Sequence, residues 1–153
     1  MQDLIIFLSS MVPLIELRGA IPYAIGFKLP LLPSYIICIL GNMLPVPFIF
    51  LFARKILVWG SDKKYIGGFF NWCLKKGEKG GKKLQEKAGR GLYVALFLFV
   101  GIPLPGTGAW TGTLAASLLD MDFKKSTLAV MCGVVLAGII MGLVSGGVFS
   151  FIR

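Results

Sequence analysis

The apolar segments of this 153-residue chain come in two lengths, and only the longer ones can cross a membrane. A membrane-spanning helix needs about 20 apolar residues. Residues 35–53 and 126–150 carry no charged side chain over 19 and 25 residues, so each predicts a spanning helix. The apolar stretches 4–12, 92–102 and 109–119 are too short, because eleven helical residues reach only about 16 Å. Two spanning helices are therefore expected to stand beside helices that enter a bilayer only part-way.

The composition agrees with an integral membrane protein and argues against an enzyme. Hydrophobic residues make up 56% of the chain and charged residues 15%, against about 25% charged residues in a soluble domain. The chain contains no His, which is the common general base and a common metal ligand. Cys38, Cys73 and Cys132 are far apart and form no recognisable disulfide or metal motif. We expect no catalytic residue, no metal site and no cofactor.

The short apolar stretches pair into two hairpins with Pro- and Gly-rich tips. Their helices and tips are 3–12, 13–19 and 20–29 in the first hairpin and 92–102, 103–108 and 109–119 in the second. Irregular backbone at membrane depth is tolerated only where it is buried in protein or lines a water-filled cavity. We therefore expect two re-entrant helical hairpins. The residues expected at their tips are Pro13, Gly19, Pro22, Pro103 and Pro105.

Basic residues concentrate in the segment between the two apolar blocks. Residues 54–90 hold eleven Lys and Arg against three Asp and Glu, in a chain of net charge +9. The positive-inside rule predicts a cytoplasmic segment, and we expect no binding to nucleic acid. This placement leaves thirteen of the sixteen Lys and Arg cytoplasmic and makes the hairpins enter from opposite faces. Within the segment, helical spacing predicts an interfacial amphipathic helix over 65–74, and a second short basic helix is expected over 82–88.

The two halves of the chain follow the same order of hairpin, loop and spanning helix. Pro13-Leu14 aligns with Pro103-Leu104 at an offset of 90, and Gly41 to Leu44 aligns with Gly133 to Leu136 at an offset of 92. The expected fold is an all-α integral membrane domain with an inverted-topology repeat. One repeat covers 1–53, the basic cytoplasmic segment covers 54–90, and the second repeat covers 91–153. Inverted repeats with broken helices are typical of secondary transporters, whose sites lie at the midplane between the repeats.

The two predicted tips carry the motifs Pro13-Leu-Ile-Glu-Leu-Arg-Gly-Ala-Ile-Pro22 and Pro103-Leu-Pro-Gly-Thr-Gly-Ala-Trp110. These motifs resemble the bacterial and archaeal small multidrug export family, which looks related to the DedA (VTT, SNARE-associated) superfamily. The resemblance implies opposed re-entrant hairpins in the plasma (inner) membrane of a prokaryote and a transport role. In the DedA relatives that role is proton-coupled and includes flipping of polyprenyl-phosphate lipid carriers. The positions it implies as functional are Glu16, Arg18, Pro22, Pro105, Gly106, Thr107 and Gly108.

Glu16 and Arg18 are the ionisable residues expected deep in the membrane. A low dielectric favours the neutral carboxylic acid, so Glu16 could accept a proton and couple transport to it. Arg18 stays charged and can hold a phosphate or carboxylate through two hydrogen bonds. The alternative interpretation is a structural ion pair between these two side chains within the tip.

The second tip is expected to add hydrogen-bond donors without charge. Thr107 is a predicted N-cap for a helix that begins near Gly108, and Gly106 and Gly108 let the backbone turn and approach a ligand. Thr111, one turn later, is expected to line the same cavity. The positive end of the half-helix dipole, together with Arg18, predicts an anion site. The alternative is that Pro-Gly-Thr-Gly forms only a tight turn.

Small residues and prolines in the longer helices suggest packing contacts and a kink. Stripes of small residues spaced by four predict helix packing between the halves or across a dimer. The stripes are Gly138, Gly142 and Gly146, and Gly108, Gly112 and Ala116. Asn42, Pro45 and Pro47 predict a kink in the first spanning helix.

The preferred hypothesis is a small secondary transporter or lipid flippase, proton-coupled through Glu16. Its expected substrate is anionic and amphipathic, such as a polyprenyl phosphate or a phospholipid headgroup, bound by Arg18 and the second tip. One alternative is an exporter of cationic drugs with Glu16 as counter-ion. Another is a non-transporting scaffold or chaperone in which Glu16 and Arg18 neutralise each other. The expected partners are membrane lipids and protons, and a homodimer would help to bury the hairpins.

Overall fold

The computed structural model describes residues 1–12, 15–72, 74–75, 86, 89–104 and 107–151, in which the regular secondary structure is all helical. The helices are α1 (Gln2–Met11), α2 (Glu16–Gly26), α3 (Leu31–Met43), α4 (Pro45–Ser61), α6 (Gly91–Gly101), α7 (Ala109–Leu118) and α8 (Phe123–Phe151). The predicted all-α class is confirmed. The hairpin helices predicted over 3–12, 92–102 and 109–119 agree with α1, α6 and α7 to within a residue at each end.

The structure contains two long helical stretches, against which the shorter helices pack. Residues 31–61, which comprise α3 and α4, and Phe123–Val148 of α8 are both long and apolar enough to cross a membrane. In the most apolar 18-residue segment of each stretch, only 28% and 33%, respectively, is buried inside the molecule. A core helix of a soluble protein would hide most of these side chains, whereas lipid-facing helices leave them outside. The predicted span 35–53 lies within residues 31–61, and the predicted span 126–150 lies within α8.

The long helical stretch is interrupted at Leu44, the residue between α3 and α4. Pro45 and Pro47 have no backbone N–H, so they cannot bond to the carbonyls four residues earlier. The interruption therefore falls where Asn42, Pro45 and Pro47 predicted a kink. Asn42 is 3% exposed, and its side-chain oxygen has no hydrogen-bond partner among the described residues.

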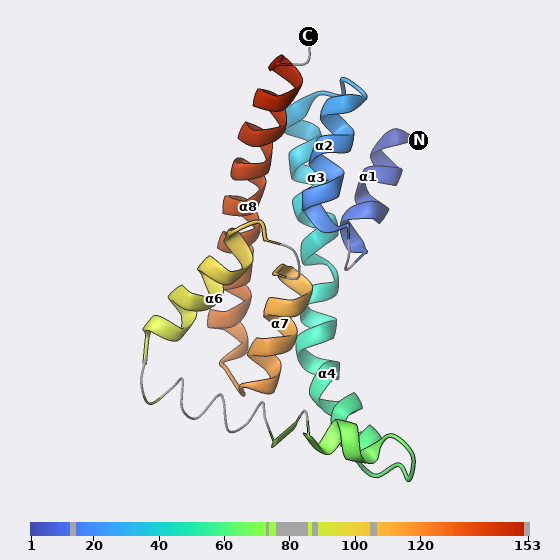
Figure 1. Cartoon of the computed structure of the whole chain (residues 1–153), viewed down its shortest axis with the longest axis vertical. Helices are drawn as coiled ribbons and strands as arrows, with labels where there is room; N and C mark the ends of the chain where they lie inside the picture. Colours follow the sequence, from blue (N-terminus) through green and yellow to red (C-terminus); the bar gives the residue numbers. More distant parts are fainter. Residues whose placement is uncertain (13–14, 73, 76–85, 87–88, 105–106, 152–153) are drawn as a thin grey trace.

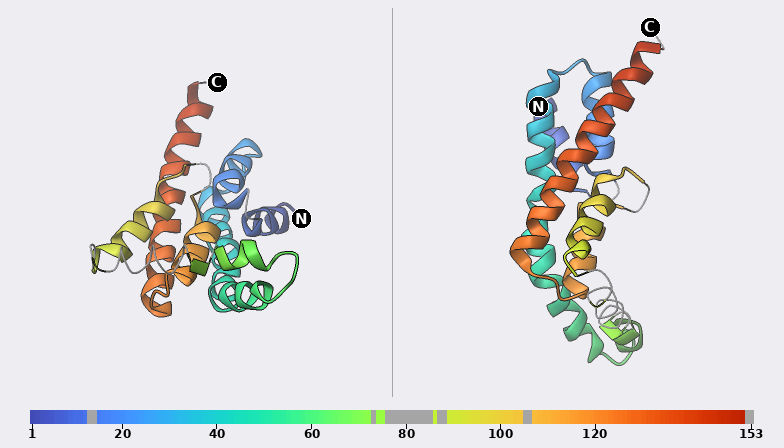
Figure 2. Two further views of the ribbon diagram at one scale, coloured as in Figure 1. Left: turned by 60° about the horizontal axis from the view of Figure 1, so that its bottom comes forward. Right: turned by 90° about the vertical axis from the view of Figure 1, so that its left-hand side faces the viewer.

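Two helical hairpins, α1–α2 and α6–α7, lie toward opposite ends of the long axis (Figure 1). The ends of α1, α2, α6 and α7 that lead to these turns lie near the middle of the molecule, where the hairpins meet. The hairpin α1–α2 lies toward the end where α8 finishes, and α6–α7 toward the end where α8 begins. A second view shows α3 and α8 running alongside each other (Figure 2), and these helices are in contact.

Helix packing in the two halves follows one pattern. Within each half the hairpin packs on its own long helix, through α1 on α3 and α6 on α8. Each hairpin also crosses to the other half, through α2 on α8 and α7 on α4. A glycine allows close packing in each half. A Cβ at Gly41 would lie 2.7 Å from the Phe7 carbonyl oxygen of α1, and a Cβ at Gly133 would lie 2.8 Å from the Phe97 carbonyl oxygen of α6.

The structure corrects the first predicted tip. Helix α2 begins at Glu16, so Glu16 to Gly19 form its first turn and are not a loop. Pro22 lies inside α2 and is not a tip residue. Its missing N–H leaves the Arg18 carbonyl without the usual helical donor. Pro103 lies between α6 and α7 as predicted, whereas Pro13, Pro105 and Gly106 lie outside the described residues.

The basic segment folds back on the end of α4 where the structure describes it. Residues 67–72 are helical, so the amphipathic helix begins later than predicted. The Asn71 side-chain amide donates to the Ser61 carbonyl at 3.2 Å, and the Lys63 ammonium lies 4.5 Å from the centre of the Trp59 ring. Cys73 and nearly all of the basic helix predicted over 82–88 lie outside the described residues.

The glycine stripe of α8 has two different environments. A Cβ at Gly138 would collide with the Tyr35 ring of α3, so this glycine serves packing between the halves. A Cβ at Gly142 or Gly146 would meet nothing within 4 Å. In the other stripe, Gly112 packs against the Val100 side chain of α6.

Candidate binding site at the hairpin tips

Glu16 is held in a conformation that most side chains avoid. Its φ of 45° lies in the left-handed region, which is uncommon for residues other than Gly, Asn and Asp. Its backbone N–H bonds to the Val12 carbonyl at 2.9 Å, which closes the turn between α1 and α2. The side chain is buried, with 6% of the residue exposed. A strained backbone that buries a carboxylate at the meeting point of two hairpins marks a functional candidate.

The Glu16 carboxylate lies against the start of α7 in the opposite hairpin. Its Oε1 accepts the backbone N–H of Trp110 at 3.3 Å. A Cβ at position 108 would collide with the same carboxylate, so Gly108 makes this close approach possible. The first N–H groups of a helix have no partner within the helix, and the helix dipole favours negative charge there. Glu16 therefore supplies an anion to the positive end of α7.

Arg18 lies against the other side of the second tip, where α6 ends. One guanidinium nitrogen donates to Thr107 Oγ1 at 2.9 Å and to the Ile102 carbonyl at 3.4 Å. The other donates to the Leu104 carbonyl. The Thr107 hydroxyl lies 2.9 Å from both of these carbonyl oxygens. Carbonyls past a helix end need external donors, and the cation of Arg18 provides them.

The Trp110 side chain, in the second hairpin, forms a hydrogen bond to the first hairpin. Its indole N–H donates to the carbonyl of Met11, the last residue of α1, at 3.0 Å. Backbone groups at the ends of α1, α6 and α7 thus form hydrogen bonds with residues of the opposite hairpin. Because each tip satisfies backbone groups of the other, the tips form one connected polar unit.

The structure brings Glu16, Arg18, Thr107 and Gly108 together, as the sequence analysis expected of the two tips. Glu16 and Arg18 nevertheless bond to the second tip, and no ion pair joins them in the part of the chain that the structure describes. The prediction that Thr107 caps α7 is wrong, because Gly108 is the N-cap. Thr107 instead bridges Arg18 and the end of α6.

Thr111, which was predicted to line a cavity at the tips, takes part in two features of α7. Its hydroxyl accepts the Gly108 N–H at 2.9 Å and so completes the capping of α7. The residue also lines, with Trp110 and several α4 side chains, an apolar groove of about 600 Å³ between α4 and α7. No role was predicted for Trp110, Ile102 or Leu104, whose contacts are largely through the backbone.

A protein-family model described as "Putative small multi-drug export protein" matches residues 16–140. The chain belongs to this family. The matched range begins at Glu16 and contains the residues of all the tip contacts described above except the Met11 and Val12 carbonyls. Family membership and the two apolar spans identify a membrane protein of an export family. Neither a curated protein nor a solved structure matches the chain.

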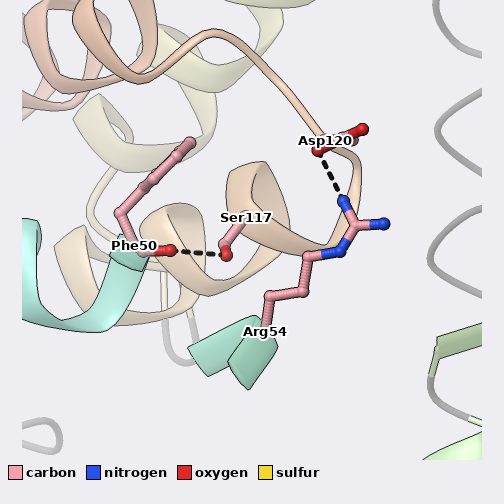
Figure 3. Close-up of polar contacts among 4 residues, drawn as sticks. All are labelled: Phe50, Arg54, Ser117 and Asp120. Atoms are coloured by element: carbon pink, nitrogen blue, oxygen red, sulfur yellow. Dashed lines mark hydrogen bonds and ion pairs between the residues drawn. The ribbon is translucent and has the colours of Figure 1, made fainter. Parts of the chain in front are cut away.

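A second polar junction joins the halves of this family member at the far end of α7 (Figure 3). Arg54 of α4 forms an ion pair with Asp120 at 2.5 Å, and the Ser117 hydroxyl donates to the Phe50 carbonyl at 2.8 Å. The Arg54 and Asp120 side chains are 37% and 79% exposed, so water weakens this ion pair. The junction fixes the base of α7, while the tip contacts fix its start.

Proposed function

We propose that the chain transports an anionic amphipathic substrate across the membrane with proton coupling, as the DedA proteins it resembles do. Its two hairpins are re-entrant and belong to an inverted repeat, with the basic 54–90 segment in the cytoplasm. The packing of Gly41 on Phe7 and of Gly133 on Phe97 supports the repeat. Phe7 and Phe97 differ by 90 and the two glycines by 92, the same offsets at which the sequence motifs align.

The observation that carries the proposal is the Glu16 carboxylate at the start of α7. A helix N-terminus is suited to a phosphate or carboxylate from any source. Glu16 therefore occupies the position that a substrate anion would take. Arg18, at the same tip, can offer two parallel hydrogen bonds to that anion in exchange for its bonds to carbonyls.

Proton coupling follows from this competition for one site. When Glu16 takes up a proton it loses its charge, and its interaction with the α7 dipole weakens. A substrate phosphate can then replace it beside Arg18. Loss of the proton restores the carboxylate, which displaces the phosphate. Proton and anion consequently travel in the same direction.

Lipid movement in proteoliposomes tests the proposal. The probe is a fluorescent short-chain phosphatidylglycerol, whose transfer between leaflets is followed by chemical quenching from outside. We expect the wild type to accelerate transfer, and an imposed proton gradient to raise the rate further. Glu16→Gln should transfer the probe at a rate that no longer responds to the gradient. Arg18→Gln should lose transfer, whereas Lys28→Gln, which removes an exposed cation from the same hairpin, should behave as wild type.

The family description favours export of drugs as the second candidate function. In that case Glu16 is a counter-ion for a cation, and Arg18 opposes binding. Efflux of a cationic dye would then be abolished by Glu16→Gln and preserved or raised by Arg18→Gln. That pattern, or retention of gradient-dependent lipid transfer by Glu16→Gln, would reject the anion proposal. A scaffold would move neither probe.

A further inference from the structure

A groove of about 690 Å³ lies between α6 and α8, away from the hairpin tips. Its walls come from one face of each helix. The lining residues are Arg90, Tyr93, Val94, Phe97, Lys125, Leu128, Ala129 and Cys132. No function considered above uses this groove.

The cations of the groove lie at the ends of its two helices. Arg90 directly precedes α6, and Lys125 is in the first turn of α8. The Lys125 ammonium lies 5.7 Å from the centre of the Tyr93 ring. Asp122 also lies here, but its carboxylate accepts the Lys125 backbone N–H at 3.0 Å as a helix cap. Two side-chain cations and two helix N-termini make this end of the groove attractive to an anion.

The rest of the groove is apolar and open. Val94 and Leu128 are each 57% exposed, and Phe97 and Cys132 also line the groove. A free phosphate would leave this apolar surface bare, and a neutral acyl chain would leave Arg90 and Lys125 unpaired. A ligand that matches the whole groove carries an anionic head and a long apolar chain.

We propose that this groove binds one anionic phospholipid. Its phosphate lies between Arg90 and Lys125, and an acyl chain covers Val94, Phe97 and Leu128. Basic residues at a membrane interface attract anionic headgroups, and the apolar length of α8 places its first turn near such an interface. The site is separate from the tips and requires only that the protein lies in a membrane, so it stands whether or not the chain transports lipid.

Cys132 provides a direct readout of occupancy, because it is exposed and lines the groove, whereas Cys38 is buried. The full chain carrying Cys73→Ser is held in uncharged detergent, and the rate of maleimide labelling at Cys132 is measured. The probes are dilauroyl-phosphatidylglycerol, dilauroyl-phosphatidylcholine and glycerol 3-phosphate. At a concentration of four times Kd, occupancy is roughly 80%, so phosphatidylglycerol should slow labelling about fivefold. Phosphatidylcholine and glycerol 3-phosphate should leave the rate unchanged.

Matched variants test the assignment to Arg90 and Lys125. The double change Arg90→Gln and Lys125→Gln should remove the protection, whereas Lys63→Gln and Lys64→Gln, which remove the same charge elsewhere, should keep it. Leu128→Glu should also remove it, which provides a test independent of the basic pair. Equal protection by phosphatidylcholine, protection that survives the groove variants, or equal loss in the Lys63 and Lys64 variant would overturn the proposal.

Discussion

The two hairpin tips meet at the centre of the molecule with unlike chemistry. The first tip contributes a carboxylate and a guanidinium, from Glu16 and Arg18. The second contributes the Trp110 N–H, the Ile102 and Leu104 carbonyls and a hydroxyl. The first half of the chain thus supplies the charged side chains, and the second half supplies the uncharged groups that hydrogen-bond to them. The comparison teaches that two tips can be joined when one supplies both charged side chains and the other supplies backbone groups and the Thr107 hydroxyl.

The largest effect on stability is expected from Arg18→Gln. Its loss leaves the Ile102 and Leu104 carbonyls without their charged donor, which should lower the free energy of unfolding by about 1.5–3 kcal/mol. Thermal unfolding in detergent would measure this change. Lys28→Gln is the matched control and should shift the midpoint little. If Glu16→Gln restored the stability of Arg18→Gln, the two residues would be a simple ion pair and the tip comparison would fail.

Gly108→Ala is the next perturbation, because the new methyl group would collide with the Glu16 carboxylate. The backbone of Gly108 is extended, with φ −172° and ψ −174°, so any cost is steric rather than conformational. We expect about 1–3 kcal/mol of destabilisation. The cost should fall in a Glu16→Ala background, and Gly142→Ala in α8 should be nearly neutral. A cost that is independent of residue 16 would argue against direct contact between the tips.

Gly41→Ala and Gly133→Ala test whether the two hairpins pack alike on their long helices, in contrast to the unlike tips. Both added methyl groups would press on a hairpin backbone carbonyl, that of Phe7 or Phe97. The added methyl groups also meet different side chains, Ser10 for position 41 and Val100 for position 133. Because the carbonyl contact is shared, the losses should be similar and at the lower end of the same range of about 1–3 kcal/mol. Chemical denaturation of the two variants side by side would check this, with Gly146→Ala as the unobstructed control. A loss confined to one variant would contradict the repeat.

The smallest effect should come from the exposed junction at the base of α7. Asp120 has a φ of 56°, a conformation that Asn also tolerates. Asp120→Asn therefore removes the charge without disturbing the backbone. We expect less than about 1 kcal/mol of destabilisation, decreasing further at high salt. A larger loss in a thermal melt would show that this junction, rather than the tips, holds the halves together.

Apolar segment lengths and proline positions predicted most of the fold. The interruption at Leu44 and the ends of α1 and α6 lie next to prolines. Helix α7 ends near Asp120, where the apolar stretch ends. The prediction failed at the start of α2, because Gly19 was expected in a tip before a helix over 20–29, and Pro22 was expected at that tip. Both lie inside α2 because tertiary packing overrides local propensity, as Leu17 and Ala20, each 1% exposed, show.

The candidate site was predicted only in its side chains. Glu16 and Arg18 were visible as charges within apolar sequence, and Gly108 as part of a turn. Their partners are mostly backbone groups, such as the Leu104 carbonyl and the Trp110 N–H, which every residue possesses and no motif reveals. Trp110 gave the one available signal, since an indole N–H in an apolar environment needs an acceptor.

The central claim is that the two hairpins enter the membrane from opposite faces and meet at their tips. Impermeant maleimide labelling in intact cells tests it directly, using Leu31→Cys at the start of α3 and Lys124→Cys at the start of α8, each in a background without Cys38, Cys73 and Cys132. We predict that position 31 is labelled from outside, whereas position 124 is labelled only after the membrane is permeabilised. Labelling of both positions in intact cells, or of neither, would place the hairpins on one face and contradict the account.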